Sequence, residues 1–257
     1  MALIKTSNPA LGKNTFSQFG RPALNDAADT ERMTLEGTVN KTGILLLCTM
    51  ATAAWTWHQF VQTRQVSDIS SLMLAGVGLG FVVALVTIFK KEWSPVTAPA
   101  YALLEGLALG GVSAVAEMRY PGIGIQAVCL TFGTLFTLLF LYRTGVIKVT
   151  DKLRLGIVAA TCGIAGLYLV ELLLGLFRGG VHFAAINGSG AIGIAFSVAV
   201  VAIAALNLVL DFDFIEQGVS VGAPKYMEWY GAFGIMVTLI WLYLEILRLL
   251  SKSRSRN

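Results

Sequence analysis

Seven long apolar segments, separated by short polar stretches, hold almost every residue of the chain after position 41. Their lengths suit helices that cross a bilayer, since a helix needs about 20 apolar residues to span the hydrocarbon core. The expected spans are roughly residues 42–62, 70–89, 97–118, 122–142, 154–177, 190–215 and 229–250. The pattern therefore predicts an all-α membrane protein, a bundle of seven transmembrane helices.

The first 40 residues break this pattern, because they are polar and carry charges of both signs. They lack the apolar core of a signal peptide, and acids such as Asp26, Asp29 and Glu31 argue against a mitochondrial presequence. We expect residues 1–40 to form a flexible, disordered cytoplasmic tail and residues 41–257 to form one membrane domain. No room remains for a second, soluble domain.

Composition supports the membrane assignment and limits the partners. The mean hydropathy is +0.72 and only 13% of residues are charged, about half the fraction usual in a soluble domain. The net charge of +4 could suggest nucleic acid, but the basic residues lie at segment ends. There they act as topology determinants and contact lipid headgroups. We therefore expect the lipid bilayer, and no nucleic acid, as the partner.

The distribution of Lys and Arg predicts the orientation, because these residues concentrate on the cytoplasmic side. Twelve lie on the side of the N-terminus and three on the other side, which predicts a cytoplasmic N-terminus. The basic residues at 248–256 conflict with this, because seven crossings would place them outside. Either packing overrides charge in the last segment or one of the last two segments does not cross; the length of the last segment favours seven crossings.

Most ionisable residues inside the spans are acids. We single out five acids within a span or at its edge, with the base Arg248 beside the last of them: Glu105, Glu171, Asp211, Asp213 and Glu245. A carboxylate in hydrocarbon is costly, and one that persists there usually faces the bundle interior or a water-filled path. Acidic linings suit cations and not anions. Carboxylates also bind Ca²⁺, and coupled pairs of them respond to pH, so we expect a path for a cation or a proton.

Each acid can line the ion path or can instead form an ordinary hydrogen bond, helix cap or ion pair. Asp211 and Asp213 point about 200° apart around a helix, so both cannot face one path. We favour Asp211 for the path and expect Asp213 to face solvent or to cap. For Glu105, a buried hydrogen bond and a place on the path are equally favoured. Glu245 precedes Arg248 by three residues, which equally allows a simple ion pair on one helix face.

Five motifs, in order along nearly the whole chain, carry a resemblance to a known family. They are SNPAL at 7–11, MTLEGTVNKTG at 33–43, YALLEGLALG at 101–110, LDFDFIE at 210–216 and WLYLEILR at 241–248. Together they resemble the bacterial branch of the Bax-inhibitor family, within the transmembrane BAX-inhibitor-motif superfamily. The resemblance implies a seven-helix fold whose last helix is central, a location in a bacterial inner membrane, and a pH-sensitive calcium leak.

In that family two aspartates, one late in helix six and one in helix seven, share a proton or hydrogen bond and gate the path. The resemblance places the first of them at Asp211. For the second, the motif favours Glu245, whereas the geometry of a hairpin that turns near residue 220 favours Glu228. Both partners remain open at this point, and Asp211 with Glu245 is the pair that would bind Ca²⁺.

Other functional classes compete with a leak channel. A hydrolase needs a nucleophile with a base, or a metal with several ligands, and the chain has only two histidines, His58 and His182. We therefore expect no enzyme activity and no cofactor, with Ca²⁺ or H⁺ as the permeating ion. A proton- or cation-coupled secondary transporter would use the same acids. A non-transporting modulator, with other membrane proteins as partners, also fits the sequence.

Overall fold

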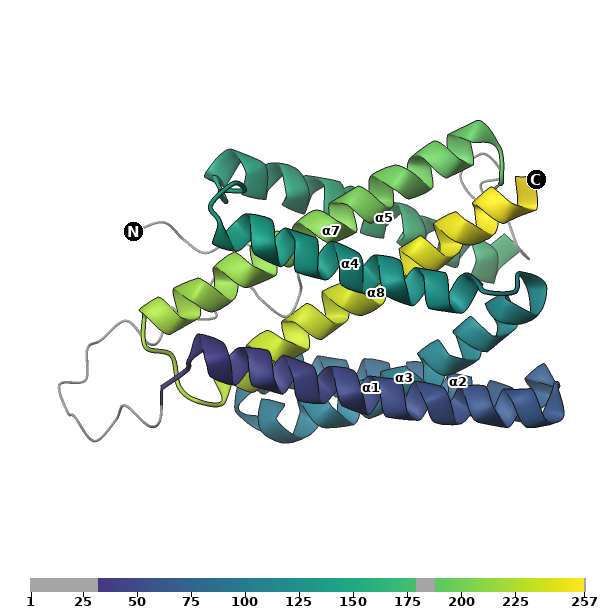
Figure 1. The fold of residues 1–257 in the computed structure, drawn as a ribbon, viewed down its shortest axis with the longest axis horizontal. Coiled ribbons are helices and arrows are strands. Elements are labelled where there is room, and N and C mark those ends of the chain that lie inside the picture. The colour runs from purple at the N-terminus through teal and green to yellow at the C-terminus, as the bar shows by residue number, and fades with distance from the viewer. Residues whose placement is uncertain (1–31, 179–187, 257) are drawn as a thin grey trace.

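The computed structural model describes residues 32–178 and 188–256, which form seven long α-helices and one short 3₁₀ helix (Figure 1). In chain order these are α1 (Leu35–Thr63), α2 (Val66–Phe89), η3 (Lys91–Trp93), α3 (Ser94–Arg119), α4 (Ile123–Arg143), α5 (Asp151–Arg178), α7 (Ala191–Ser220) and α8 (Met227–Arg256). All seven α-helices are long and apolar enough to cross a membrane. The predicted all-α fold with seven spans is confirmed.

The last helix, α8, is central. Figure 1 shows it running between one group of helices, α1, α2 and α3, and a second group, α4, α5 and α7. It contacts α1, α3, α4 and α7 along its length. In its apolar stretch 67% of the residues are buried, against 6% in α5. The other helices therefore cover α8, while α5 lies at the edge of the bundle with few fully buried residues.

Contacts at the helix ends show that α1, α3 and α8 run in the same direction. At the end where α1 and α8 begin, Arg32 forms an antiparallel bridge with Pro224, and Ser94 donates a hydrogen bond to the carbonyl of Tyr226. At the opposite end, Arg254 donates to the carbonyl of Pro121 over 2.6 Å. These contacts fit seven crossings. Arg254, one of the basic C-terminal residues, packs against the loop before α4. This agrees with the alternative in which packing overrides charge in the last segment.

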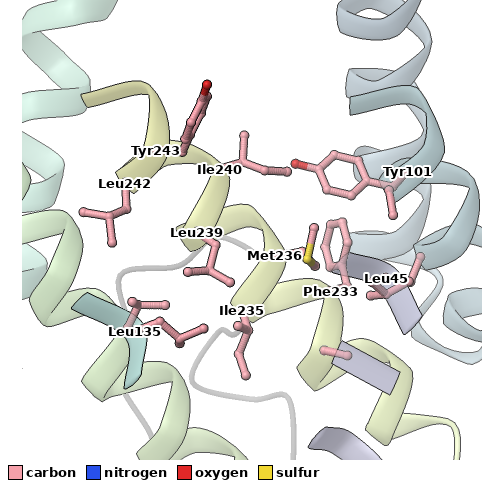
Figure 2. Packing of buried hydrophobic residues seen from close by; sticks show 14 of the residues in the cluster. Leu45, Tyr101, Leu135, Phe233, Ile235, Met236, Leu239, Ile240, Leu242 and Tyr243 are labelled. Atoms are coloured by element: carbon pink, nitrogen blue, oxygen red, sulfur yellow. The ribbon is translucent and has the colours of Figure 1, made fainter. Parts of the chain in front are cut away.

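The core between α8 and its first group of neighbours is aromatic and aliphatic. Figure 2 shows Phe233 and Met236 of α8 facing Tyr101 of α3 and Leu45 of α1. The rings of Tyr101 and Phe233 meet edge to face with centroids 5.0 Å apart, a geometry worth about 0.5–1.5 kcal/mol beyond area burial. This core fixes the rotation of α8 and so determines which of its residues face α7.

Close backbone packing joins α1 to α3. A Cβ placed on Gly106 would lie 2.0 Å from Thr52 Oγ1 and 2.4 Å from the carbonyl oxygen of Thr49. The lack of a side chain at Gly106 therefore lets α3 approach the backbone of α1, and Thr49 adds a hydrogen bond to the carbonyl of Ala102 over 3.0 Å. Small residues commonly mediate helix contacts in membranes in this way.

Helix α1 begins earlier than the hydrophobic pattern predicted. Residues 35–40 were expected in the tail, but α1 starts at Leu35, capped by the Thr34 side chain, which accepts from Gly37 N. These residues belong to the bundle because Met33 N donates to the carbonyl of Ala223, in the loop before α8. The rest of the expected tail, residues 1–31, lies outside the described residues.

The hairpin between α7 and α8 also turns later than expected. Helix α7 was predicted to end near 215 but continues to Ser220, and α8 begins at Met227. The acids at 213 and 216 resembled the end of a span, yet they lie inside the helix because neighbouring side chains bind them. This shift of about one helical turn changes which residues of α7 and α8 face each other.

Candidate functional site

Asp211 lies inside the bundle, where α7 packs against α8. Its side chain is fully buried, and Thr238 of α8 donates a hydrogen bond from Oγ1 to Asp211 Oδ2 over 2.5 Å. Thr238 is also buried. A buried carboxylate needs donors to replace its lost hydration, and the two side chains form a buried polar pair between α7 and α8. This buried position is the one that we expected for Asp211 if it lies on the ion path.

The structure does not bring Glu228 or Glu245 to Asp211. Thr238, which faces Asp211, follows Glu228 by ten residues and precedes Glu245 by seven. At 1.5 Å per residue, the two glutamates lie about 15 and 10 Å from Thr238 along α8. The expected alignment of Glu228 with Asp211 depended on a turn near residue 220, whereas the loop covers 221–226.

Glu228 instead binds the beginning of α1. Its side chain is fully buried, and it accepts hydrogen bonds at Oε1 from Thr34 N at 2.9 Å and from Thr34 Oγ1 at 2.8 Å. Lys41 Nζ binds Oε2, and Lys225 Nζ lies 3.0 Å from Oε1. The negative charge thus meets two cations and the first turn of a helix, where a carboxylate is favoured. Glu228 joins the first and last helices.

Gly37 leaves the space that the Glu228 side chain fills. A Cβ built on Gly37 would lie 2.2–2.4 Å from the Glu228 carboxyl group. We predict that Gly37→Ala lowers the free energy of unfolding by about 1–3 kcal/mol, the cost typical of overpacking. The matched control is Gly43→Ala on the same helix, where an added Cβ meets nothing within 4 Å. Thermal unfolding in detergent measures both, and equal melting temperatures would contradict the prediction.

Asp213 faces a different neighbour from Asp211, as the two-residue spacing predicted. Arg154 of α5 forms an ion pair with its Oδ2, and Gln217 donates to the same oxygen over 2.5 Å. One turn further, Tyr142 of α4 donates to Glu216. These contacts bind α4, α5 and α7 together near one end of the bundle. Asp213 therefore has a structural partner in Arg154 and does not point into the interior beside Asp211.

Glu245 lies near the opposite end of α8. Its buried carboxylate accepts from Arg248 at 3.0 Å and from the hydroxyl of Tyr168 on α5 at 3.0 Å. Arg248 also donates to Tyr168 Oη over 2.6 Å. One turn further along α8, Lys252 donates to Ser197 Oγ on α7 over 2.9 Å. The ion pair with Arg248 was one of the two expected roles of Glu245, and the contact with Tyr168 adds a link to α5.

Glu105 belongs to the interface between α2 and α3. It is partly buried, and the Tyr101 side chain, one turn earlier, is its hydrogen-bond partner. A Cβ on Gly80 of α2 would lie 3.1 Å from Glu105 Oε1. Of the two roles expected for Glu105, this arrangement corresponds to the local hydrogen bond.

The five acids described above therefore occupy five places and not one shared cluster: Glu105, Asp211, Asp213, Glu228 and Glu245. Asp211 and Glu245, the pair expected to bind Ca²⁺, have different neighbours. Within residues 32–178 and 188–256, no group of three or more Asp, Glu, His or Cys side chains could hold a metal ion. Any cation bound at Asp211 would need neutral oxygens to complete its coordination.

An apolar cavity of about 150 Å³ lies on the other side of α8, between α1, α3 and α4. Met236, Leu239 and Ile240 line it from α8 and are shown in Figure 2. At its edge Ser113 Oγ and Tyr243 Oη lie 2.6 Å apart. A cavity lined by apolar groups stays dry. Its walls contain no charged side chain, which distinguishes it from the polar surroundings of Asp211.

Several residues of the polar interior were not singled out from the sequence. Asn207 and Thr238 flank Asp211, on α7 and α8, and Thr161 of α5 accepts from Asn207 Nδ2 over 2.9 Å. All three are neutral residues within apolar spans, so a search for ionisable residues in the spans does not find them. A signal was present, because Arg154, Thr161 and Tyr168 repeat every seven residues and so lie on one face of α5.

Comparison with known proteins agrees with the architecture. A family model described as "Bax inhibitor 1 like" matches residues 8–255, nearly the whole chain. No curated protein and no solved structure gives a match. The match covers all seven membrane-spanning helices and the motifs at 33–43, 101–110, 210–216 and 241–248. The chain therefore belongs to the Bax inhibitor 1 like family of multi-pass membrane proteins.

Proposed function

We propose that this protein is a membrane channel that lets cations, calcium first among them, leak down their gradient in a pH-sensitive manner. The carboxylate of Asp211 controls the passage. The observation that carries the proposal is the full burial of Asp211 between α7 and the central helix α8, where Thr238 binds it. An acid retained in the membrane interior is costly and usually serves ion or proton movement.

Two further considerations support a cation leak. Membership in the Bax inhibitor 1 like family agrees with the calcium leak that the sequence resemblance implies. A carboxylate is a hard oxygen ligand suited to Ca²⁺, and its protonation removes the charge that holds a cation. The distribution of Lys and Arg favours a cytoplasmic N-terminus. The resemblance to the bacterial branch of the family favours the inner membrane of a bacterium as the membrane that the leak would cross.

We predict that Asp211→Asn reduces calcium flux into liposomes about tenfold or more and abolishes its difference between pH 6 and pH 8. Asparagine keeps the shape and can still bind Thr238, but it lacks the charge; an interaction with a charged group is worth about 1.5–3 kcal/mol. The measurement uses purified protein, an enclosed calcium indicator and an imposed gradient. Thermal unfolding of both proteins checks that the variant is folded.

Glu216→Gln is the matched control. Glu216 lies on the same helix but is exposed, and a glutamine can keep the contact with Tyr142. Its flux should equal that of the wild type. Wild-type flux no higher than that of empty liposomes would overturn the leak, and saturable uptake coupled to a gradient would favour a transporter. Unchanged flux in Asp211→Asn would remove Asp211 from the path.

A further inference from the structure

Three polar residues on one face of α5 attach this helix to the bundle. Arg154, Thr161 and Tyr168 follow one another at intervals of seven residues, or about 10 Å along the helix. Each contacts a polar residue of another helix: Arg154 binds Asp213, Thr161 accepts from Asn207, and Tyr168 donates to Glu245. We call the interface of α5 with α7 and α8 the seam. It has a polar contact at each of these three positions along α5.

Apart from this seam, α5 has few buried contacts. Only 6% of its apolar stretch is buried, the lowest share among the seven spans. Its main helix contact is with α7. Interhelical hydrogen bonds in membranes are worth only about 0.6 kcal/mol each on average. Moving α5 away from α7 would therefore cost little packing energy, far less than moving α8.

The middle of the seam leads to Asp211. Asn207 and Asp211 are four residues apart on α7 and so lie one above the other on the same face. Thr161 of α5 binds the first and Thr238 of α8 binds the second. One carboxylate and three neutral oxygen-bearing side chains thus lie within about one helical turn, about 6 Å along α7, and a hard cation prefers such oxygen ligands.

An ion pair lies on either side of this group. Arg154 pairs with Asp213 toward one end of the bundle, and Arg248 pairs with Glu245 toward the other. Both pairs involve α5, since Arg154 belongs to it and Tyr168 contacts both Glu245 and Arg248. Separation of α5 would disturb both pairs together and expose the oxygens between them to water.

We infer that the cation route runs along this seam, lined by Thr161, Asn207 and Asp211, and that α5 moves away from α7 to open it. The inference rests on the proposed function and specifies its route. The alternative route is the cavity of about 150 Å³ on the other side of α8, whose walls are apolar. Water and a cation enter a polar seam more readily than a dry apolar cavity.

Two adjacent positions on α5 test the route at one depth in the membrane. Cys162 is exposed on the lipid side of the helix, whereas Thr161 is in the seam. One variant keeps Cys162 alone, through Cys48→Ala and Cys129→Ala. The other also carries Thr161→Cys and Cys162→Ala. The probe is a positively charged, water-soluble methanethiosulfonate reagent, and mass spectrometry follows its reaction in proteoliposomes.

We expect the thiol at position 161 to react at least about tenfold faster than Cys162, because a thiol in hydrocarbon stays protonated and inert. Its modification should also block calcium flux, and a reducing agent should restore it. Equal reaction rates at the two positions would overturn the seam as a wet route. Fast modification with unchanged flux would overturn it as the ion route, even where Asp211→Asn still shows that the leak exists. If the wild type does not leak, the proposed function fails, while the thiol rates still show whether water enters the seam.

Discussion

Replacing Glu228 by alanine should lower the free energy of unfolding by about 3–5 kcal/mol, the cost typical when one partner of a buried ion pair is removed. The carboxylate is fully buried and holds four donors: Thr34 N, Thr34 Oγ1, Lys41 Nζ and Lys225 Nζ. Alanine would leave the mostly buried ammonium of Lys41 without this partner. Alanine would also remove the acceptor for the backbone N–H and the hydroxyl of Thr34, the N-cap of α1. The contact between the first helix and the last helix would therefore be lost.

A series of variants separates the charge of Glu228 from its hydrogen bonds. Glu228→Gln keeps an oxygen for Thr34 but removes the ion pairs, so its loss should be smaller than that of Glu228→Ala. A double-mutant cycle with Lys41→Met isolates the coupling between the two side chains. Glu216→Gln, at an exposed acid and with an oxygen kept for Tyr142, should change stability by less than about 0.5 kcal/mol. Unfolding in detergent measures each variant; a loss below about 1 kcal/mol in Glu228→Ala would show that the contact is not important for stability.

Hydrophobic periodicity was sufficient to predict the seven spans, because each contains an uninterrupted apolar stretch of membrane length. The same pattern could not locate the start of α1. Residues 35–40 mix polar and apolar side chains and resemble a tail, yet they form the first turns of a helix because Glu228 binds Thr34 and Lys41. Glu228 is 194 residues from Thr34 and 187 from Lys41 in the chain, and no local pattern reveals such partners.

The register between α7 and α8 was the largest gap between sequence and structure. Asp211 was expected to face a second acid, and the sequence offered only Glu228 and Glu245 on the last helix. The residue that faces it is Thr238. A neutral hydroxyl within an apolar helix gives no charge signal, and the position of the turn could not be fixed while α7 was thought to end near 215. The burial of Asp211, in contrast, followed from the cost of a carboxylate in hydrocarbon.

Replacing Thr238 by valine should increase the cation leak about tenfold or more. Valine has nearly the shape of threonine but no hydroxyl, so Asp211 Oδ2 loses the hydrogen bond from Thr238. A hydrogen bond to a charged group is worth about 1.5–3 kcal/mol, and 1.4 kcal/mol corresponds to a factor of ten. A cation entering the site no longer has to displace this bond. Calcium flux into liposomes measures the effect, and Thr238→Ser, which keeps the hydroxyl, is the matched control.

A general loosening of the bundle could also increase the flux, so stability must be measured beside it. Thr238→Val should cost about 1–3 kcal/mol, because it weakens the satisfaction of a buried acceptor. Gly37→Ala is expected to cost a similar amount at the contact between α1 and Glu228, and Glu228 lies about three helical turns along α8 from Thr238. If the leak depends on the bond between Thr238 and Asp211, only Thr238→Val raises the flux. Equal increases in both variants would mean that the flux follows global stability, and the hydrogen bond would then have no specific part in holding the path closed.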